Sequence, residues 1–196
     1  MASHALEPDP LSEADAASHA LEPDPLSEAD AACLAAAAIA EDSRAGLAVM
    51  LGLYAGLRRE EIAGLRWAQI TAGWLSVVGK REVAGEIPLH PVLEERLRVA
   101  RLSRVSPFVF PGQGGGHVAP ATVWLWCRQL SGRALGFEIS PHVLRHTAIA
   151  TLNDTTRDLR AAQVFARHLS PETTVLYTRV SRRRLVEAVE AIDYAS

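Results

Sequence analysis

The chain has 196 residues, of which 48% are hydrophobic and 22% are charged, with a formal net charge of −3. This composition indicates one globular domain with an added segment, and no hydrophobic run is long enough to span a membrane. The first residues lack the pattern of a secretion signal, and two cysteines, Cys33 and Cys127, form no disulfide framework. We therefore expect a cytoplasmic protein of a bacterium or its phage, with no membrane partner.

Negative charge is concentrated at the N-terminus. Residues 1–31 contain eight acidic residues and no Lys or Arg, which leaves 15 of the 23 acidic residues and all 20 basic ones in the rest, a net charge of +5. A modestly basic body favours polyanions. Residues 2–16 recur letter for letter as residues 17–31. We expect residues 1–25 to be a disordered acidic linker and residues 26–196 to form the domain.

Capping residues predict the first helices. Ser27, followed by Asp30, can cap a helix that continues through the alanine-rich residues 31–40. Residues 43–55 are predicted to form a second helix that ends at glycine, and residues 57–67 a short amphipathic one.

Arg58 lies at the junction between these two helices, and Glu61 follows it on the same helical face. A carboxylate at this spacing can hold or orient the guanidinium group. An ordinary surface ion pair is the alternative for any isolated pair of this kind.

A β-hairpin is predicted next. Residues 74–78 and 86–89 are β-rich, and Lys80 lies at the start of their connection. Residues 108–110 predict a third short strand, and residues 91–101 and 121–133 two further helices.

Lys80 is the one lysine among 20 basic residues. An ammonium group, unlike a guanidinium, can release a proton near neutral pH, so Lys80 is a candidate proton donor; a surface lysine is the alternative.

Ser140 and Pro141 predict the start of a helix with His142 and Arg145 in its first turn. A helix start attracts phosphate and disfavours protonation of a nearby imidazole, so His142 is a candidate base. His146 completes an H-x-x-x-H spacing, but the pattern lacks the glutamate of H-E-x-x-H, and we expect no metal.

The same Ser-Pro pattern recurs at Ser170 and Pro171, after His168, and predicts a helix that carries Tyr177 about two turns in. Taken alone, a helical tyrosine is more often a packing residue than a nucleophile.

Residues 52–69, 76–90 and 139–180 together resemble the catalytic domain of the tyrosine site-specific recombinases, the phage integrase family. This resemblance implies an α+β fold, a mainly helical single domain with a small antiparallel β-sheet. Glu61 matches an acidic position of the family's first motif. The family carries Arg, Lys, His-x-x-Arg, His and Tyr in this order, and the matching residues here are Arg58, Lys80, His142, Arg145, His168 and Tyr177.

The resemblance also implies the chemistry. Tyr177 would attack a scissile phosphate to form a 3′-phosphotyrosyl link, while Arg58 and Arg145 bind the non-bridging oxygens. Lys80 would protonate the leaving 5′ oxygen, and His142 would accept the tyrosine proton. The covalent intermediate keeps the phosphodiester energy, so we expect no ATP, metal or other cofactor.

The remaining implied contacts are with DNA. His168 would hydrogen-bond the phosphate, and Arg59, Arg81 and Arg179 would contact the duplex. The expected partners are double-stranded DNA at recombination sites and further copies of the chain in a tetrameric synapse, with the free chain monomeric or weakly associating.

The sequence departs from the family's pattern in three places. Arg167 stands where family members usually have glycine, and Val83, Ala84 and Gly85 replace basic residues common in the hairpin. The helical core-binding domain that usually precedes the catalytic domain is not found, which implies a catalytic fragment or a minimal recombinase.

Residues 183–196 predict a C-terminal helix with a stripe formed by Leu185, Val189 and Ile192. Core packing would explain the stripe. Because the corresponding segment in the family often docks on a neighbouring protomer, we hypothesise such a contact, in which case deleting the segment would spare folding.

Three alternatives to recombination are open. A type IB topoisomerase would relax supercoils without joining a partner duplex. A DNA-binding accessory protein would tolerate loss of Tyr177 or Lys80, and a protein-only interaction module would need no arginine-histidine phosphate site. Supercoil relaxation, strand exchange and salt-dependent DNA binding separate these classes.

Overall fold

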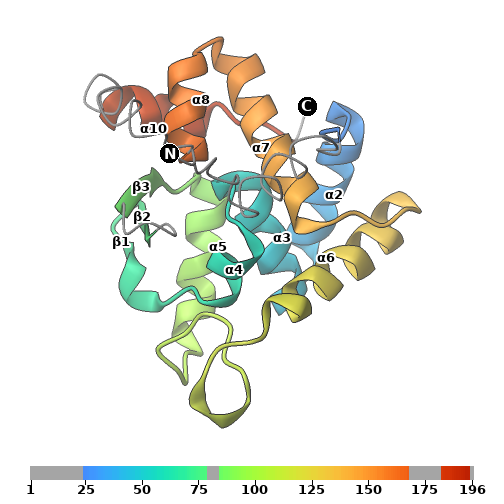
Figure 1. The fold of residues 1–196 in the computed structure, drawn as a ribbon, viewed down its shortest axis with the longest axis vertical. Helices are drawn as coiled ribbons and strands as arrows, with labels where there is room; N and C mark the ends of the chain where they lie inside the picture. Colours follow the sequence, from blue (N-terminus) through green and yellow to red (C-terminus); the bar gives the residue numbers. More distant parts are fainter. Residues whose placement is uncertain (1–23, 79–83, 168–181, 195–196) are drawn as a thin grey trace, which may run out of the picture.

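The computed structural model describes residues 24–78, 84–167 and 182–194. Helices dominate, and one small antiparallel sheet lies to one side of them (Figure 1). The α-helices are α2 (Glu28–Ala40), α3 (Arg44–Ala55), α4 (Arg59–Ala63), α5 (Pro91–Leu102), α6 (Pro120–Leu135), α7 (Pro141–Thr156), α8 (Leu159–Ala166) and α10 (Arg182–Glu190). The strands are β1 (Ile70–Thr71), β2 (Trp74–Val78) and β3 (Ala84–Pro88). The predicted α+β class is confirmed.

Local capping chemistry determines where the helices begin. The Ser27 side chain accepts a hydrogen bond from the backbone N–H of Asp30 at 3.1 Å, and Ser43 makes the equivalent bond at the start of α3, also at 3.1 Å. Such an oxygen satisfies one of the donors that the first helical turn leaves unpaired. Pro141 is the first residue of α7, where its lack of an N–H group costs no hydrogen bond. The helices predicted at these three starts are confirmed.

The sheet has the order β1-β2-β3, with both pairs antiparallel. Leu75 on the central strand pairs with Ile70 of β1 and Ile87 of β3, and all three side chains are buried. This register puts one hydrophobic face of the sheet against the core. The predicted hairpin between residues 74 and 89 is confirmed.

The third strand differs from the prediction. Residues 108–110 were expected to supply it, but Phe108 makes only an isolated bridge with Arg66. The strand beside β2 is instead β1, which pairs Thr71 with Trp74. Only residues 72 and 73 connect β1 to β2, so the chain turns back at once and β1 pairs along this edge of β2. The edge is therefore occupied by the segment that directly precedes β2.

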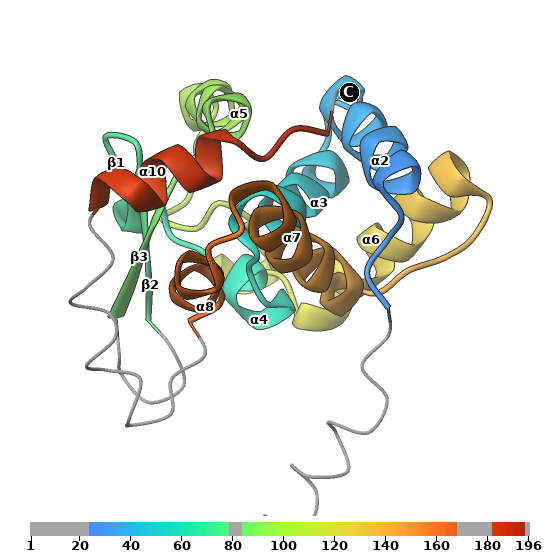
Figure 2. The same cartoon turned by 90° about the horizontal axis from the view of Figure 1, so that it is seen from above.

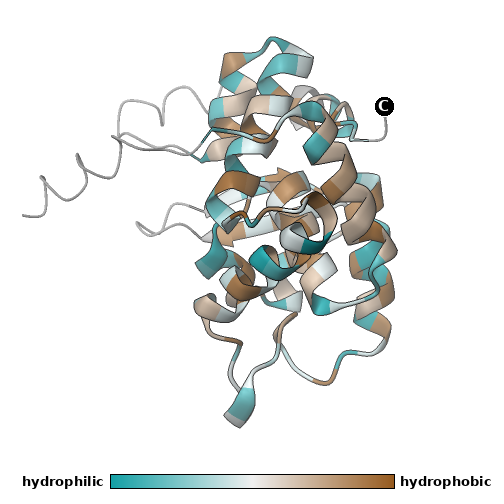
Figure 3. Ribbon diagram, turned by 90° about the vertical axis from the view of Figure 1, so that its right-hand side faces the viewer, coloured by the Kyte–Doolittle hydropathy of each residue, from teal (hydrophilic) through white to brown (hydrophobic). Residues whose placement is uncertain are grey.

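Helix α3 is the centre of the helical part. Every residue from Gly46 to Ala55 is buried, and α2, α6 and α7 pack around the helix (Figures 1 and 2). A helix enclosed in this way must be hydrophobic on all faces, as its sequence is. The surrounding helices carry both hydrophobic and hydrophilic turns (Figure 3). The C-terminal end of α3 reaches α4, α7 and α8, where the candidate site lies.

The C-terminal segment packs on its own chain. Helix α10 contacts α7, α8 and β3, and Leu185, Val189 and Ile192 are buried there (Figure 2). The hydroxyl group of Tyr194 donates a hydrogen bond to the carbonyl oxygen of Leu53 at 2.9 Å. The predicted stripe is therefore confirmed as a packing face, and within this chain it is part of the core. Among the helices of the described residues, none has the length and hydrophobicity needed to cross a bilayer.

Candidate active site

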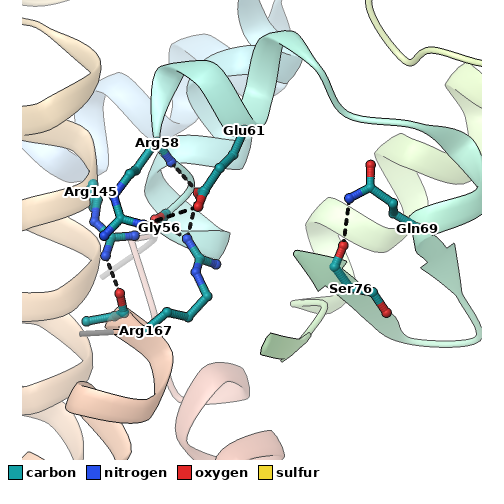
Figure 4. Close-up of polar contacts among 8 residues, drawn as sticks. Gly56, Arg58, Glu61, Gln69, Ser76, Arg145 and Arg167 are labelled. Atoms are coloured by element: carbon teal, nitrogen blue, oxygen red, sulfur yellow. Dashed lines mark hydrogen bonds and ion pairs between the residues drawn. The ribbon is translucent and has the colours of Figure 1, made fainter. Parts of the chain in front are cut away.

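Two guanidinium groups meet at the C-terminal end of α3 (Figure 4). Gly56 ends the helix with φ 57° and ψ 32°, a left-handed conformation that favours glycine. A Cβ atom at this position would lie 2.8 Å from Cε1 of Phe165 on α8. The backbone carbonyl oxygen of Gly56 accepts hydrogen bonds from Arg145 and Arg167. The end of α3 thus supplies an acceptor that brings side chains from two other elements together.

Arg58 and Glu61 form the first part of the site, at the start of α4. The backbone N–H of Arg58 donates to Oε2 of Glu61 at 2.7 Å, and Nη1 of Arg58 donates to Oε1 at 3.2 Å. The carboxylate therefore both caps the short helix and orients the guanidinium group. The Arg58 side chain is 44% exposed, whereas that of Glu61 is 11% exposed. The predicted proximity of this pair is confirmed, and the Arg58 guanidinium remains accessible to a ligand.

Arg145 is the buried cation of the site. It is 3% exposed on α7, and its guanidinium group donates to the carbonyl oxygens of Gly56 and Ala166. A buried charge is stable only when it is paired or hydrogen-bonded. These two carbonyl groups lie at the C-terminal ends of α3 and α8, where the helix dipole adds negative character. Two helix ends thus fix the plane of the Arg145 guanidinium.

Arg167, which stands where family members usually have glycine, joins the same cluster. It follows α8 in the left-handed region, at φ 51° and ψ 35°. Its Nη2 donates to Oε2 of Glu61 at 2.7 Å and lies 3.4 Å from the carbonyl oxygen of Gly56 (Figure 4). In the folded chain, Gly85 leaves space on the hairpin for this long side chain.

His142 and His146 form a pair on one side of α7. Their Nε2 atoms lie 3.0 Å apart, and the ring centroids are 4.5 Å apart. His142 is exposed, whereas Arg145 on the same helical turn is buried. The predicted first turn of α7 is therefore present, with the His142 imidazole toward solvent and the Arg145 guanidinium toward the core. Among the described residues, no group of three or more His, Cys, Asp or Glu side chains could hold a metal ion.

The structure describes only one of the other predicted site residues, Arg59. Arg59 is exposed on α4 and pairs with Glu60 at 2.6 Å. The remaining predicted residues lie outside the described part of the chain; they are Lys80, Arg81, His168, Tyr177 and Arg179. The structure therefore brings together Arg58, Glu61 and Arg145, and adds Arg167.

The charge of this cluster suits an oxyanion. Three arginines and Glu61 give a formal charge of +2, and guanidinium groups stay protonated at any physiological pH. Their paired N–H groups match the oxygens of a phosphate. The arrangement can therefore bind a phosphate group and stabilise negative charge that develops on it.

The chain is similar to known proteins in sequence. A sequence model of the phage integrase family matches residues 25–184. The tyrosine recombinase XerC of Pseudomonas aeruginosa (strain LESB58) is 31% identical over 142 residues, which cover 69% of this chain and 47% of that protein. The chain thus spans about half the length of the curated relatives it matches.

Solved structures show the same fold. The integrase of mycobacterium phage Brujita superposes with a TM-score of 0.72 at 30% identity, over 88% of this chain and 58% of that one. The XerH site-specific recombinase bound to its difH substrate, in a pre-cleavage complex, superposes with a TM-score of 0.65 at 19% identity, over 80% of this chain and 50% of that one. The second likeness concerns the fold alone. With the family match extending over most of its length, this chain belongs to the phage integrase family and has the fold of a tyrosine recombinase catalytic domain.

Proposed function

We propose that this chain cuts and rejoins DNA at specific sites through a 3′-phosphotyrosyl intermediate on Tyr177. The observation that carries the proposal is that Arg58 and Arg145 lie together near the C-terminal end of α3, where Glu61 of α4 holds Arg58 and the carbonyl oxygen of Gly56 holds Arg145 (Figure 4). An exposed guanidinium and a rigidly held buried one offer donors to the two non-bridging oxygens of a phosphodiester. Family membership supports the same chemistry.

The proposed reaction moves one phosphoryl group between two oxygens. The Tyr177 oxygen attacks phosphorus, the bond from phosphorus to the 5′ oxygen breaks, and the phosphate stays on the 3′ end as a tyrosine ester. His142 accepts the tyrosine proton, and Lys80 donates a proton to the leaving 5′ oxygen. Religation reverses these steps with a 5′-hydroxyl from another strand.

His168 is the remaining proposed phosphate ligand in this scheme, while Arg59, Arg81 and Arg179 contact the duplex. Two duplexes are each cut on both strands during exchange, so one tyrosine per copy requires four copies. We therefore propose a tetramer on DNA, acting in a bacterial cytoplasm. Residues 26–196 would be the catalytic unit and residues 1–25 a linker.

Covalent trapping tests the proposal. The full chain is incubated with a pool of nicked duplexes of randomised sequence, in EDTA and without ATP, and adducts are separated on a denaturing gel. A nick close to the cut lets the short 5′-hydroxyl fragment diffuse away, which traps the intermediate. The matched control is Tyr177→Phe, which keeps the ring and removes the nucleophile.

We expect an adduct with the parent chain and none with Tyr177→Phe. Equal adduct from both, or none from the parent chain, would refute the proposal. Sequencing the trapped duplexes would identify the site. If the parent chain relaxes supercoiled plasmid without joining two duplexes, the function is that of a type IB topoisomerase instead.

A further inference from the structure

Arg167 has a backbone conformation that its own side chain disfavours. The residue has φ 51°, in the left-handed region where a Cβ atom crowds the following carbonyl group. Arg157 is the other non-glycine residue with positive φ among those described, and it ends α7. A strained residue persists when its surroundings hold it in place, and such residues cluster at functional sites.

The contacts that hold Arg167 are those of the phosphate site. Its side chain is 6% exposed, and Nη2 bonds Oε2 of Glu61, the oxygen that also accepts the backbone N–H of Arg58. The same nitrogen approaches the carbonyl oxygen of Gly56, which also accepts from Arg145. Arg167 therefore shares one acceptor with each of the other two arginines (Figure 4).

The stem of Arg167 fits over the sheet because residue 85 is glycine. A Cβ atom on Gly85 of β3 would lie 2.9 Å from Cδ of Arg167 and 3.2 Å from its Cγ. Contacts this close would displace the arginine. Two of the residues that depart from the family's pattern, Arg167 and Gly85, are thus in contact, and the placement of the Arg167 side chain depends on the absence of a side chain at residue 85.

We propose that Arg167 is a positioning residue of the phosphate site, which sets the charge and orientation of Arg58 through Glu61. This inference rests on the proposed function and deepens it. With Arg167 present, the Glu61 carboxylate is divided between two guanidinium groups, and the cluster has a formal charge of +2. Without Arg167, the carboxylate pairs with Arg58 alone, and the charge next to the phosphate falls to +1.

The physical consequence is a change in oxyanion affinity with little change in folding. In Arg167→Gly, glycine relieves the left-handed strain, and Glu61 keeps both bonds to Arg58. The domain should therefore stay folded. Its affinity for a phosphate should fall about tenfold, because the opposing carboxylate is no longer shared.

The test measures inorganic phosphate binding to the full chain, from the rise in melting temperature with phosphate concentration at constant ionic strength. Arg167→Gly is compared with Arg167→Lys, which keeps the charge and should recover part of the affinity. The matched control is Arg96→Gln on α5, a residue whose side chain contacts the segment just before the start of α3. Arg96 also bonds a carboxylate, that of Asp42, and a backbone carbonyl, that of Glu41.

A mutant cycle with Gly85 tests the packing. Gly85→Ala should lower phosphate affinity in the parent chain, because the new methyl group displaces Arg167. In the Arg167→Gly background the same substitution should have no further effect. Additive effects of the two substitutions would overturn the coupling.

The rate of DNA cleavage distinguishes a positioning role from a purely structural one. A purely structural role of Arg167 would affect cleavage of a charged and of a neutral scissile group equally. On the nicked duplex, Arg167→Gly should slow single-turnover cleavage, and this defect relative to the parent chain should be smaller when a methylphosphonate replaces the scissile phosphate and removes its charge. Unchanged phosphate affinity, no phosphate-dependent stabilisation of the parent chain, or equal defects on both substrates would overturn the proposal. Because phosphate binding needs no nucleophile, failure of the parent chain to form an adduct would refute the proposed function separately.

Discussion

The carbonyl oxygen of Gly56 accepts a hydrogen bond from the guanidinium group of Arg145, which lies 89 residues later in the chain. The bond joins the end of α3 to α7 and fixes a buried cation that contacts a second helix end at Ala166. The position of the arginine therefore depends on how α3 terminates. The consequences of changing that terminus can be measured.

Gly56→Ala should destabilise the domain and displace Arg145. The left-handed conformation costs a residue with a Cβ about 1 kcal/mol, and the added methyl group lies 2.8 Å from Phe165, so we expect a total loss of about 2–4 kcal/mol in the free energy of unfolding. The matched control is Gly136→Ala at the end of α6, where φ is 80° and nothing lies within 4 Å of the new Cβ. Urea denaturation should show a loss of about 1 kcal/mol there. Equal losses in both variants would contradict the packing argument.

Glu61→Gln should impair cleavage more than folding. With its oxygen at the position of Oε2, the amide can still accept from the backbone N–H of Arg58 and from Arg167, but its NH₂ group at the position of Oε1 cannot accept from the Arg58 guanidinium group. A lost charge-assisted hydrogen bond is worth about 1.5–3 kcal/mol, so single-turnover cleavage of the nicked duplex should slow by about 10- to 100-fold. Glu60→Gln is the control, because that side chain is 56% exposed and pairs with Arg59. A similar defect in both variants would mean that the charge of α4 matters and the position of Glu61 does not.

Local signals predicted most of the elements, whereas the long-range contacts could not be read from the sequence. Ser27 and Pro141 predict the starts of α2 and α7, because helix capping depends on neighbouring residues alone. The third strand was wrongly assigned to residues 108–110, since a two-residue strand such as β1 has too little pattern to detect.

In the candidate site, too, the local contacts were predicted and the long-range contacts were not. Arg58 and Glu61 were predicted to be close because three residues separate them on one helical face. The role of Arg167 was missed because its contacts with Glu61 and Gly85 join segments that only the tertiary structure brings together. The left-handed backbone of Arg167 would be less costly for a glycine at the same position.

Removal of residues 183–196 should destabilise the domain, contrary to the hypothesis drawn from the sequence that folding would be spared. The segment buries Leu185, Val189 and Ile192 against the chain's own helices, and each such side chain contributes roughly 1.5–3 kcal/mol. We expect a loss of more than about 4 kcal/mol, a large fraction of the stability of a typical domain. The milder variant Tyr194→Phe keeps the ring and loses only the hydrogen bonds of the hydroxyl group, which include the one to Leu53, and should cost about 1 kcal/mol. Thermal unfolding of a truncated chain that matches the parent would restore the docking hypothesis.

The stability of the domain should also fall as the pH drops below about 6.5, the pKa of an unfolded histidine, because of His90. Burial lowers the pKa of this residue, and a backbone hydrogen bond to Ile192 and the carboxylates of Glu190 and Asp193 oppose that shift only in part. The folded state therefore favours the neutral ring, and its Nδ1 accepts the backbone N–H of Val92 at the start of α5, at 3.3 Å.

The sign of the effect follows from proton linkage. Above pH 6.5 His90 is neutral in both states, and its cap contributes fully; as the pH falls, the unfolded state binds the proton more readily, so unfolding becomes easier. The loss should be at most about 1 kcal/mol, the usual worth of a helix cap, because the ring is only partly buried and solvent screens its charge. Urea titrations between pH 7.5 and about 5 should show this slope, above the range in which carboxylates titrate. His90→Asn keeps a capping oxygen without a titrating group, so its stability should be flatter over the same range. Parallel slopes for the two proteins would show that another group titrates.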